Sequence, residues 1–210
     1  MNLRCRTTLL WLLIVIPLAF PGCTRKETKS LLQPSAALGA VMAEESIRAA
    51  GSKKTIAVIT HDANWGPTST VEEAFQTALR ARGLTVSTAK TVNLGDPMHS
   101  GEIGLRLDDF MEALAKSSDA GAIVSFAGAP LLKPTDSSRI PAEHPPVLVV
   151  STATLGNLPG LRAEPMQLGR LLEARIIQLA IIDGSDPSAT KTDPTHELFA
   201  QHFRILRRPD

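Results

Sequence analysis

The feature of this sequence that most constrains its fold is the alternation of short apolar runs with longer amphipathic segments. The first run, TIAVIT at 55–60, is continuous and rich in β-branched residues, which is typical of a strand buried on both faces of a parallel sheet. A stretch with alternating sides lies at 84–90, further apolar runs lie at 120–128 and 146–152, and segments with apolar residues at helical spacing lie at 70–82, 102–116 and 165–182. Strands that alternate with helices predict a parallel sheet covered by helices on both faces.

We therefore predict an α/β fold, a Rossmann-like three-layer sandwich with a mostly parallel sheet of about four to five strands. The crossovers between its parallel strands should be right-handed. In the last amphipathic segment, 165–182, five residues are predicted to face inward: Leu168, Leu171, Leu172, Ile176 and Leu179. Residues 198–206 are predicted to form a final edge strand.

The N-terminus has the pattern of a bacterial export signal. Arg4 and Arg6 precede an apolar run at 9–20, and the small residue Gly22 stands directly before Cys23. The run is too short for a membrane-spanning helix, which needs about 20 apolar residues. The pattern resembles the lipobox of bacterial lipoproteins, which implies that residues 1–22 are removed as a signal peptide and that Cys23 receives the lipid. The alternative is an ordinary cleaved signal followed by an incidental cysteine.

The resemblance to lipoproteins also implies a location. The protein would be lipid-anchored in the cell envelope, facing the periplasm or the cell exterior, with the membrane as its first partner. Thr24, not an aspartate, follows the cysteine, and the sorting habit of lipoproteins then favours the outer membrane in a double-membraned cell. We expect 23–52 to form a tether with a short helix at 37–50, and 53–210 to form a single α/β domain.

Composition excludes several classes of function. The formal net charge of +1 provides no basic field for nucleic acid. The chain has two cysteines, and Cys5 lies in the leader, so we expect no disulfide in the exported part. The histidines form no H-E-x-x-H pair, and we expect neither a metal nor a cofactor.

Polar residues follow three of the predicted strands. In open α/β sheets, ligands bind beyond the carboxyl ends of the strands, and hydroxyl, carboxylate, amide and indole groups gathered there would suit a small polar ligand. The residues predicted to bind it are Thr60, His61, Asp62, Asn64, Trp65, Ser125 and Ser151, with Phe126 and Thr152 beside them. The alternative is that these residues only cap helices and form turns.

Two stretches of the chain resemble a known family. They are KKTIAVITHDANWGPTSTVEEAFQTALRARGLTV at 53–86 and DDFMEALAKSSDAGAIVSFAG at 108–128, and they resemble the N-terminal lobe of type 1 periplasmic binding proteins, the sugar-binding and LacI-like group. The D-A-I-I signature of that group corresponds here to Asp119 followed by 122–124. These proteins close two lobes around a ligand, whereas 53–210 has room for one. The resemblance therefore implies the fold of one lobe, and favours a sensor, a scaffold or a degenerate descendant over a transport protein.

Three functions remain open at the level of the sequence. The first is a non-catalytic lipoprotein that binds a small polar ligand or an envelope protein. The second is an envelope hydrolase or transferase that uses His61 and Asp62, and the third is a structural envelope component without a small ligand. We favour the first, because the sequence contains no G-x-S-x-G, Walker-type or G-x-G-x-x-G motif that would specify a reaction.

Overall fold

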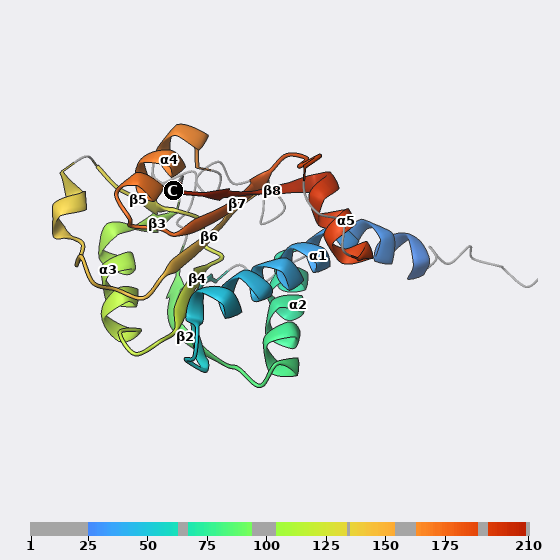
Figure 1. The fold of residues 1–210 in the computed structure, drawn as a ribbon, viewed down its shortest axis with the longest axis horizontal. Coiled ribbons are helices and arrows are strands. Elements are labelled where there is room, and N and C mark those ends of the chain that lie inside the picture. Colours follow the sequence, from blue (N-terminus) through green and yellow to red (C-terminus); the bar gives the residue numbers. More distant parts are fainter. Residues whose placement is uncertain are drawn as a thin grey trace, which may run out of the picture.

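The fold is built on a six-stranded, mostly parallel β-sheet (Figure 1). The computed structural model describes residues 25–62, 67–93, 104–133, 135–153, 163–188 and 193–208. The strands of the sheet, in spatial order, are β2 (Thr85–Val92), β1 (Thr55–His61), β4 (Ala122–Ser125), β6 (Val147–Ser151), β7 (Leu179–Asp183) and β8 (Phe203–Arg207). The first five run parallel, and β8 runs antiparallel to β7. The predicted α/β class is confirmed, with six strands in place of four to five.

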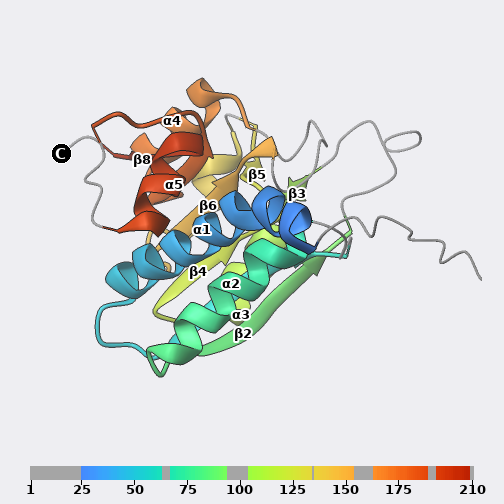
Figure 2. The same cartoon turned by 90° about the vertical axis from the view of Figure 1, so that its right-hand side faces the viewer.

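Helices cover both faces of this sheet. One face carries α1 (Arg25–Ala50), α2 (Pro67–Ala81) and α5 (Pro194–His202), and the other carries α3 (Leu107–Lys116) and α4 (Pro165–Glu173) (Figures 1 and 2). A short parallel pair, β3 (Leu105–Arg106) and β5 (Pro130–Leu131), contacts α3. The 3-10 helix η1 (Asp136–Arg139) precedes β6. The result is the predicted three-layer sandwich.

The apolar runs form strands because they are buried from both sides. Every residue of β4 and β6 is buried, as expected for central parallel strands under two helical layers. On the side of α2, the rings of Phe75 and Phe126 meet edge to face with centroids 5.1 Å apart, a favourable aromatic geometry.

The order of the strands fixes where the sheet opens. From β1 the chain passes through α2 to β2 at one edge, then through α3 on the opposite face to β4 on the other side of β1. The direction of winding therefore reverses between β1 and β4. In doubly wound sheets, this reversal separates the loops at the carboxyl ends of the two strands and leaves a crevice there.

Helix α1 is longer than the helix expected at 37–50, since it begins at Arg25. Its residues Leu38, Val41 and Met42 are buried in the common core with the sheet and α2. Gly39 lies where α1 approaches α2 most closely: a Cβ atom at this position would be 2.2 Å from the carbonyl oxygen of Val71. From 32 onward, where side chains are described, the helix is therefore packed as part of the α/β domain.

The single helix predicted at 165–182 is wrong in its second half. Helix α4 ends at Glu173, and Leu179, which was expected on its inward face, begins β7. Arg175 has a φ of 60°, a left-handed conformation that a helix cannot contain. Beyond it the chain turns into LAIID, whose first four residues are buried. The leucine spacing fits a helix and a buried strand equally well, because an apolar run that faces the core on all sides carries no period.

The strand predicted at 198–206 is also partly wrong. Its first half is helix α5, and only Phe203–Arg207 forms the edge strand β8. The helix begins because the carboxylate of Asp193 accepts hydrogen bonds from the backbone N–H groups of Thr195 and His196, with Pro194 at the first helical position. This is a standard N-terminal cap, and it overrides the weak apolar pattern of the segment.

Candidate functional site

The carboxyl edge of the sheet gathers the residues predicted to bind a ligand, as far as the structure describes them. Thr60, His61 and Asp62 lie at the end of β1, Ser125 at the end of β4 and Ser151 at the end of β6. The strands pair in the order β1, β4, β6, so these ends are neighbours. Asn64, Trp65 and Cys23 lie outside the described residues.

Two polar side chains at this edge are buried without a hydrogen-bond partner among the described residues. Both ring nitrogens of His61 lack one, and so does the hydroxyl of Thr152, directly after β6. His61 is 3% exposed and Thr152 is fully buried. Burial lowers the pKa of His61, partly opposed by the charge of Asp62, so the imidazole is neutral at pH 7. A buried polar group without a partner destabilises a fold by about 1–3 kcal/mol, which makes these two groups exceptional.

Thr60 has a partner that the sequence did not suggest. Its hydroxyl donates a 2.6 Å hydrogen bond to the carboxylate of Glu72 on α2. Burial raises the pKa of Glu72, and the hydrogen bond from Thr60 opposes this shift. The Glu72 side chain is half-buried. No pattern in the sequence indicates this pair, because Thr60 and Glu72 meet only when α2 packs over β1.

The two predicted serines bond to nearby backbone. The hydroxyl of Ser125 donates to the carbonyl of Gly128 at 2.6 Å. The hydroxyl oxygen of Ser151 accepts from the N–H of Ala163 at 2.8 Å. The Ser125 bond closes a short turn after β4, a role that Ser often has, whereas the Ser151 bond ties the residue two positions before α4 to the end of β6.

A cavity of about 370 Å³ opens at the carboxyl ends of β6 and β7. Ser151 and Asp183 line it from the strand ends, and Arg204 lines it from β8. The backbone N–H of Ala153 donates to the carboxylate of Asp183 at 2.9 Å. The complete lining is Ser151, Ala163, Glu164, Pro165, Ile182, Asp183 and Arg204. The cavity thus offers two acids, a guanidinium and the first turn of α4, a set that suits a small ligand with both donor and acceptor groups.

His61 and Asp62, the residues of the enzymatic alternative, are not hydrogen-bonded to each other. Asp62 is exposed, and neither nitrogen of the His61 ring is hydrogen-bonded to it. Among the same residues no cluster of three or more metal-ligating side chains occurs. No helix in the described ranges has the length and apolar content to cross a bilayer.

Fold and site together define a doubly wound α/β domain with an open carboxyl edge. No family model matches the chain, and no curated protein matches it. One of the solved structures that it resembles is a periplasmic ribose ABC transporter protein from Conexibacter woesei, with 16% identity over 79% of this chain and 47% of that one and a TM-score of 0.45. Another is a sugar ABC transport substrate-binding protein from Bordetella parapertussis, with 14% identity over 79% of this chain and 43% of that one and a TM-score of 0.44. A third is a solute-binding protein from Burkholderia graminis in complex with D-arabinose, with 16% identity over 70% of this chain and 47% of that one and a TM-score of 0.43.

These neighbours are periplasmic binding proteins, the group that the sequence resembles. The chain spans a little under half the length of each. At these identities and TM-scores, the likeness assigns no ligand to the chain.

Proposed function

We propose that the protein is a lipid-anchored, non-catalytic binding protein of the cell envelope, and that its α/β domain binds a small polar ligand at the carboxyl edge of the sheet. Acylated Cys23 would hold the domain at the membrane, with the outer membrane favoured by Thr24 in a double-membraned cell. An envelope protein is the other partner class that the sequence left open.

The observation that carries the ligand proposal is the pair of unpartnered buried groups at this edge. The imidazole of His61 and the hydroxyl of Thr152 have no partner among the described residues. His61 is the last residue of β1 and Thr152 directly follows β6, on either side of β4. A ligand that hydrogen-bonds to either group would remove its desolvation cost of about 1–3 kcal/mol. Binding would therefore recover free energy that folding alone leaves unfavourable.

The cavity lined by Ser151, the residue before Thr152, suggests the chemistry of the ligand. Arg204 attracts an anionic or acceptor group, and Glu164 and Asp183 attract donors. The volume of about 370 Å³ is at the small end of the range for ligand pockets. A monosaccharide or an amino acid has the required size and the required mixture of donors and acceptors.

Thermal denaturation of the full chain, with panels of monosaccharides and amino acids, tests the binding proposal. A ligand at 100 times its dissociation constant stabilises the fold by about 2.7 kcal/mol, or roughly 5–11 °C for a domain of this size. Thr152→Val should weaken the binding of an active compound about fivefold, through the loss of one hydrogen bond. Ser138→Ala, an exposed position in η1, should leave binding unchanged. If every active compound raises the midpoint of Thr152→Val as much as that of the wild type, the proposed site is contradicted. If no compound of the panels raises the midpoint of the wild type, the proposed function is contradicted.

The anchor is tested separately. Labelled palmitate fed to the expressing cells should be incorporated into the wild-type chain, and the chain should fractionate with membranes. Cys23→Ser should abolish both, because the thiol is the acceptor of the lipid. Incorporation of label into Cys23→Ser, or its absence from the wild type, would refute the anchor without affecting the binding proposal.

A further inference from the structure

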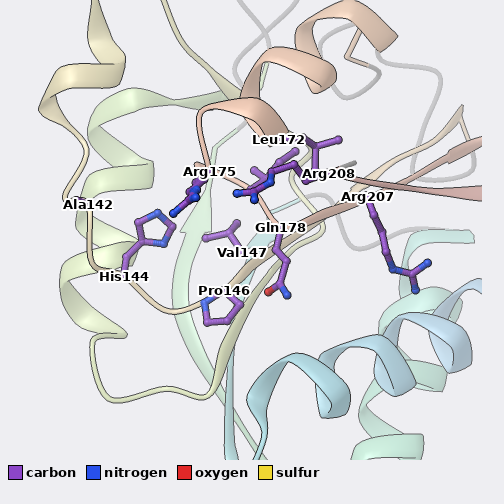
Figure 3. A pocket seen from close by; sticks show the side chains of 10 residues that line it. Ala142, His144, Pro146, Val147, Leu172, Arg175, Gln178, Arg207 and Arg208 are labelled. Atoms are coloured by element: carbon purple, nitrogen blue, oxygen red, sulfur yellow. The ribbon is translucent and has the colours of Figure 1, made fainter. Parts of the chain in front are cut away.

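A second cavity, of about 420 Å³, lies at the opposite edge of the sheet (Figure 3). It is formed by the chain entering β6 and β7 and by the end of β8. Its size falls within the range of ligand pockets. Apolar side chains form part of its wall, and the remaining side chains are basic or amide groups; its principal members are Val147, Leu172, His144, Arg175, Gln178 and Arg208.

Two of the arginines at this cavity have no acidic partner among the residues that the structure describes. Arg207 forms an ion pair with Glu45 at 2.7 Å, and its side chain points away from the cavity towards α1 (Figure 3). Arg175 and Arg208, by contrast, form no ion pair or side-chain hydrogen bond with any residue that the structure describes. None of the described residues that line the cavity is acidic. Within the described part of the chain, two positive charges therefore stand uncompensated beside an apolar wall.

His144 adds a third nitrogen ligand group to the same cavity. Its Nδ1 lies 2.8 Å from the carbonyl oxygen of Pro145, and since a carbonyl only accepts, Nδ1 must carry the proton. The Nε2 atom is then the one that can contact a ligand.

The backbone at Arg175 singles this residue out. The chain leaves α4 in a Schellman turn: the N–H of Arg175 donates to the carbonyl of Leu172 at 3.1 Å, and that of Ile176 to Leu171 at 2.9 Å. The residue at the position of Arg175 has a positive φ, here 60°, and is usually glycine because a Cβ is unfavourable there. An arginine in that place costs stability, and local rules of this kind are broken mainly at functional sites.

We infer that this cavity is a binding site for a phosphate monoester with an apolar portion. Two guanidinium groups that have no counter-ion among the described residues match the double negative charge of such an ester, which is mostly a dianion at pH 8 because its second pKa lies near 6. Guanidinium groups also bind phosphate oxygens in a bidentate manner. The wall of Pro146, Val147 and Leu172 would contact the apolar portion of the ligand. The site lies at the edge opposite the one discussed under the proposed function, and does not depend on it.

Calorimetric titration of the full chain at pH 8 tests the inference, with phenyl phosphate as the probe and benzoate as its singly charged counterpart. Phenyl phosphate should bind at least tenfold more tightly than benzoate. Arg175→Gly and Arg208→Gln should each weaken its binding tenfold or more, while Arg175→Lys should retain part of it. Arg80→Gln is the matched control, because Arg80 is an exposed arginine that bonds to Gln76 on α2, outside this cavity.

The source of the phosphate group is resolved by a second titration, with monomeric dihexanoyl phosphatidic acid against dihexanoyl phosphatidylcholine. If phosphatidic acid binds more tightly than phenyl phosphate and its binding depends on Arg175, the natural ligand is a lipid headgroup. If phenyl phosphate binds more tightly, the natural ligand is a soluble ester. The inference is overturned if neither monoester binds, if benzoate binds as tightly, or if Arg175→Gly binds as well as the wild type. Thermal denaturation of Arg175→Gly shows that a loss of binding does not reflect unfolding, because its midpoint should not fall.

Discussion

The contact between α1 and α2 can be tested with one methyl group. In Gly39→Ala, the new Cβ would stand 2.2 Å from the carbonyl oxygen of Val71 and 2.9 Å from the backbone nitrogen of Phe75. Real Cβ contacts are longer than 3.0 Å, so the two helices must separate by roughly 1 Å. Forcing a group into a packed core costs about 1–3 kcal/mol, and here both nearest atoms are backbone, which cannot rotate away. The better helix propensity of alanine returns about 1 kcal/mol.

The expected net result is a loss of up to about 2 kcal/mol, or roughly 4–8 °C in the denaturation midpoint at the larger value. Gly169→Ala is the matched control, because it also lies in a helix but a Cβ there has no neighbour within 4 Å. It should stabilise the fold by about 0.5–1 kcal/mol. Urea denaturation followed by circular dichroism measures both variants. If Gly39→Ala proves as stable as Gly169→Ala, then α1 does not pack against α2 as described, and residues 32–50 act as a tether rather than as part of the domain.

Three further outcomes follow from single positions. Arg175→Gly should raise the free energy of unfolding by about 0.5–1 kcal/mol, because relief of the left-handed strain, about 1–2 kcal/mol, exceeds the extra unfolded-state entropy of glycine, about 0.5–1 kcal/mol. Ala174→Gly, at a φ of −73°, should lower the free energy of unfolding. If urea denaturation shows that both substitutions change this free energy in the same direction, the left-handed turn is contradicted. Thr152→Val should stabilise the ligand-free fold by about 1 kcal/mol, because it removes the unpartnered hydroxyl. Thr85→Val should give no gain in stability, since the Thr85 hydroxyl bonds to the backbone carbonyl of Lys54. If Thr152→Val has a lower midpoint than the wild type in thermal denaturation, the hydroxyl has a partner. Burial lowers the pKa of His196, but its hydrogen bonds and charge interactions with Asp193 and Glu44 outweigh this and raise the pKa above 6.5. The stability that His196 adds relative to His196→Gln should therefore be full below pH 6.5 and disappear as the pH rises through the folded-state pKa. A difference in unfolding free energy between the two proteins that grows with pH would refute this ion pair.

The central strands were predictable because their environment leaves one option. A residue under two helical layers must be apolar on both faces, so β1, β4 and β6 consist of uninterrupted apolar runs that no surface helix would contain. The right-handed rule for crossovers then predicts the face on which each connecting helix lies, whereas the reversal of winding between β1 and β4 is seen only in the structure. The same rule failed for β7, because its run follows α4 after only a short turn and the leucines of both elements share one helical spacing.

The carboxyl edge was predictable in its location, because the ends of parallel strands must meet. The state of each side chain there was not. Whether the hydroxyl of Ser151 bonds to Ala163, or that of Thr152 remains unpartnered, depends on how the following chain returns to the edge. Likewise, Glu72 comes to Thr60 only through the packing of α2 on the sheet. Contacts between separate segments of this kind leave no periodic trace in a sequence.

The basic cavity was hidden by a single error of boundary. A helix running to 182 would place Arg175 on an exposed helical face, where a charged side chain needs no explanation. Once the helix ends at Glu173, the same arginine occupies the left-handed position of a Schellman turn and its side chain borders a cavity. Glycine would satisfy the turn at lower cost, so the backbone does not account for the arginine, and the side chain must. A charged residue at a left-handed helix end is therefore a signal that sequence reasoning can use, provided that the end of the helix is placed correctly.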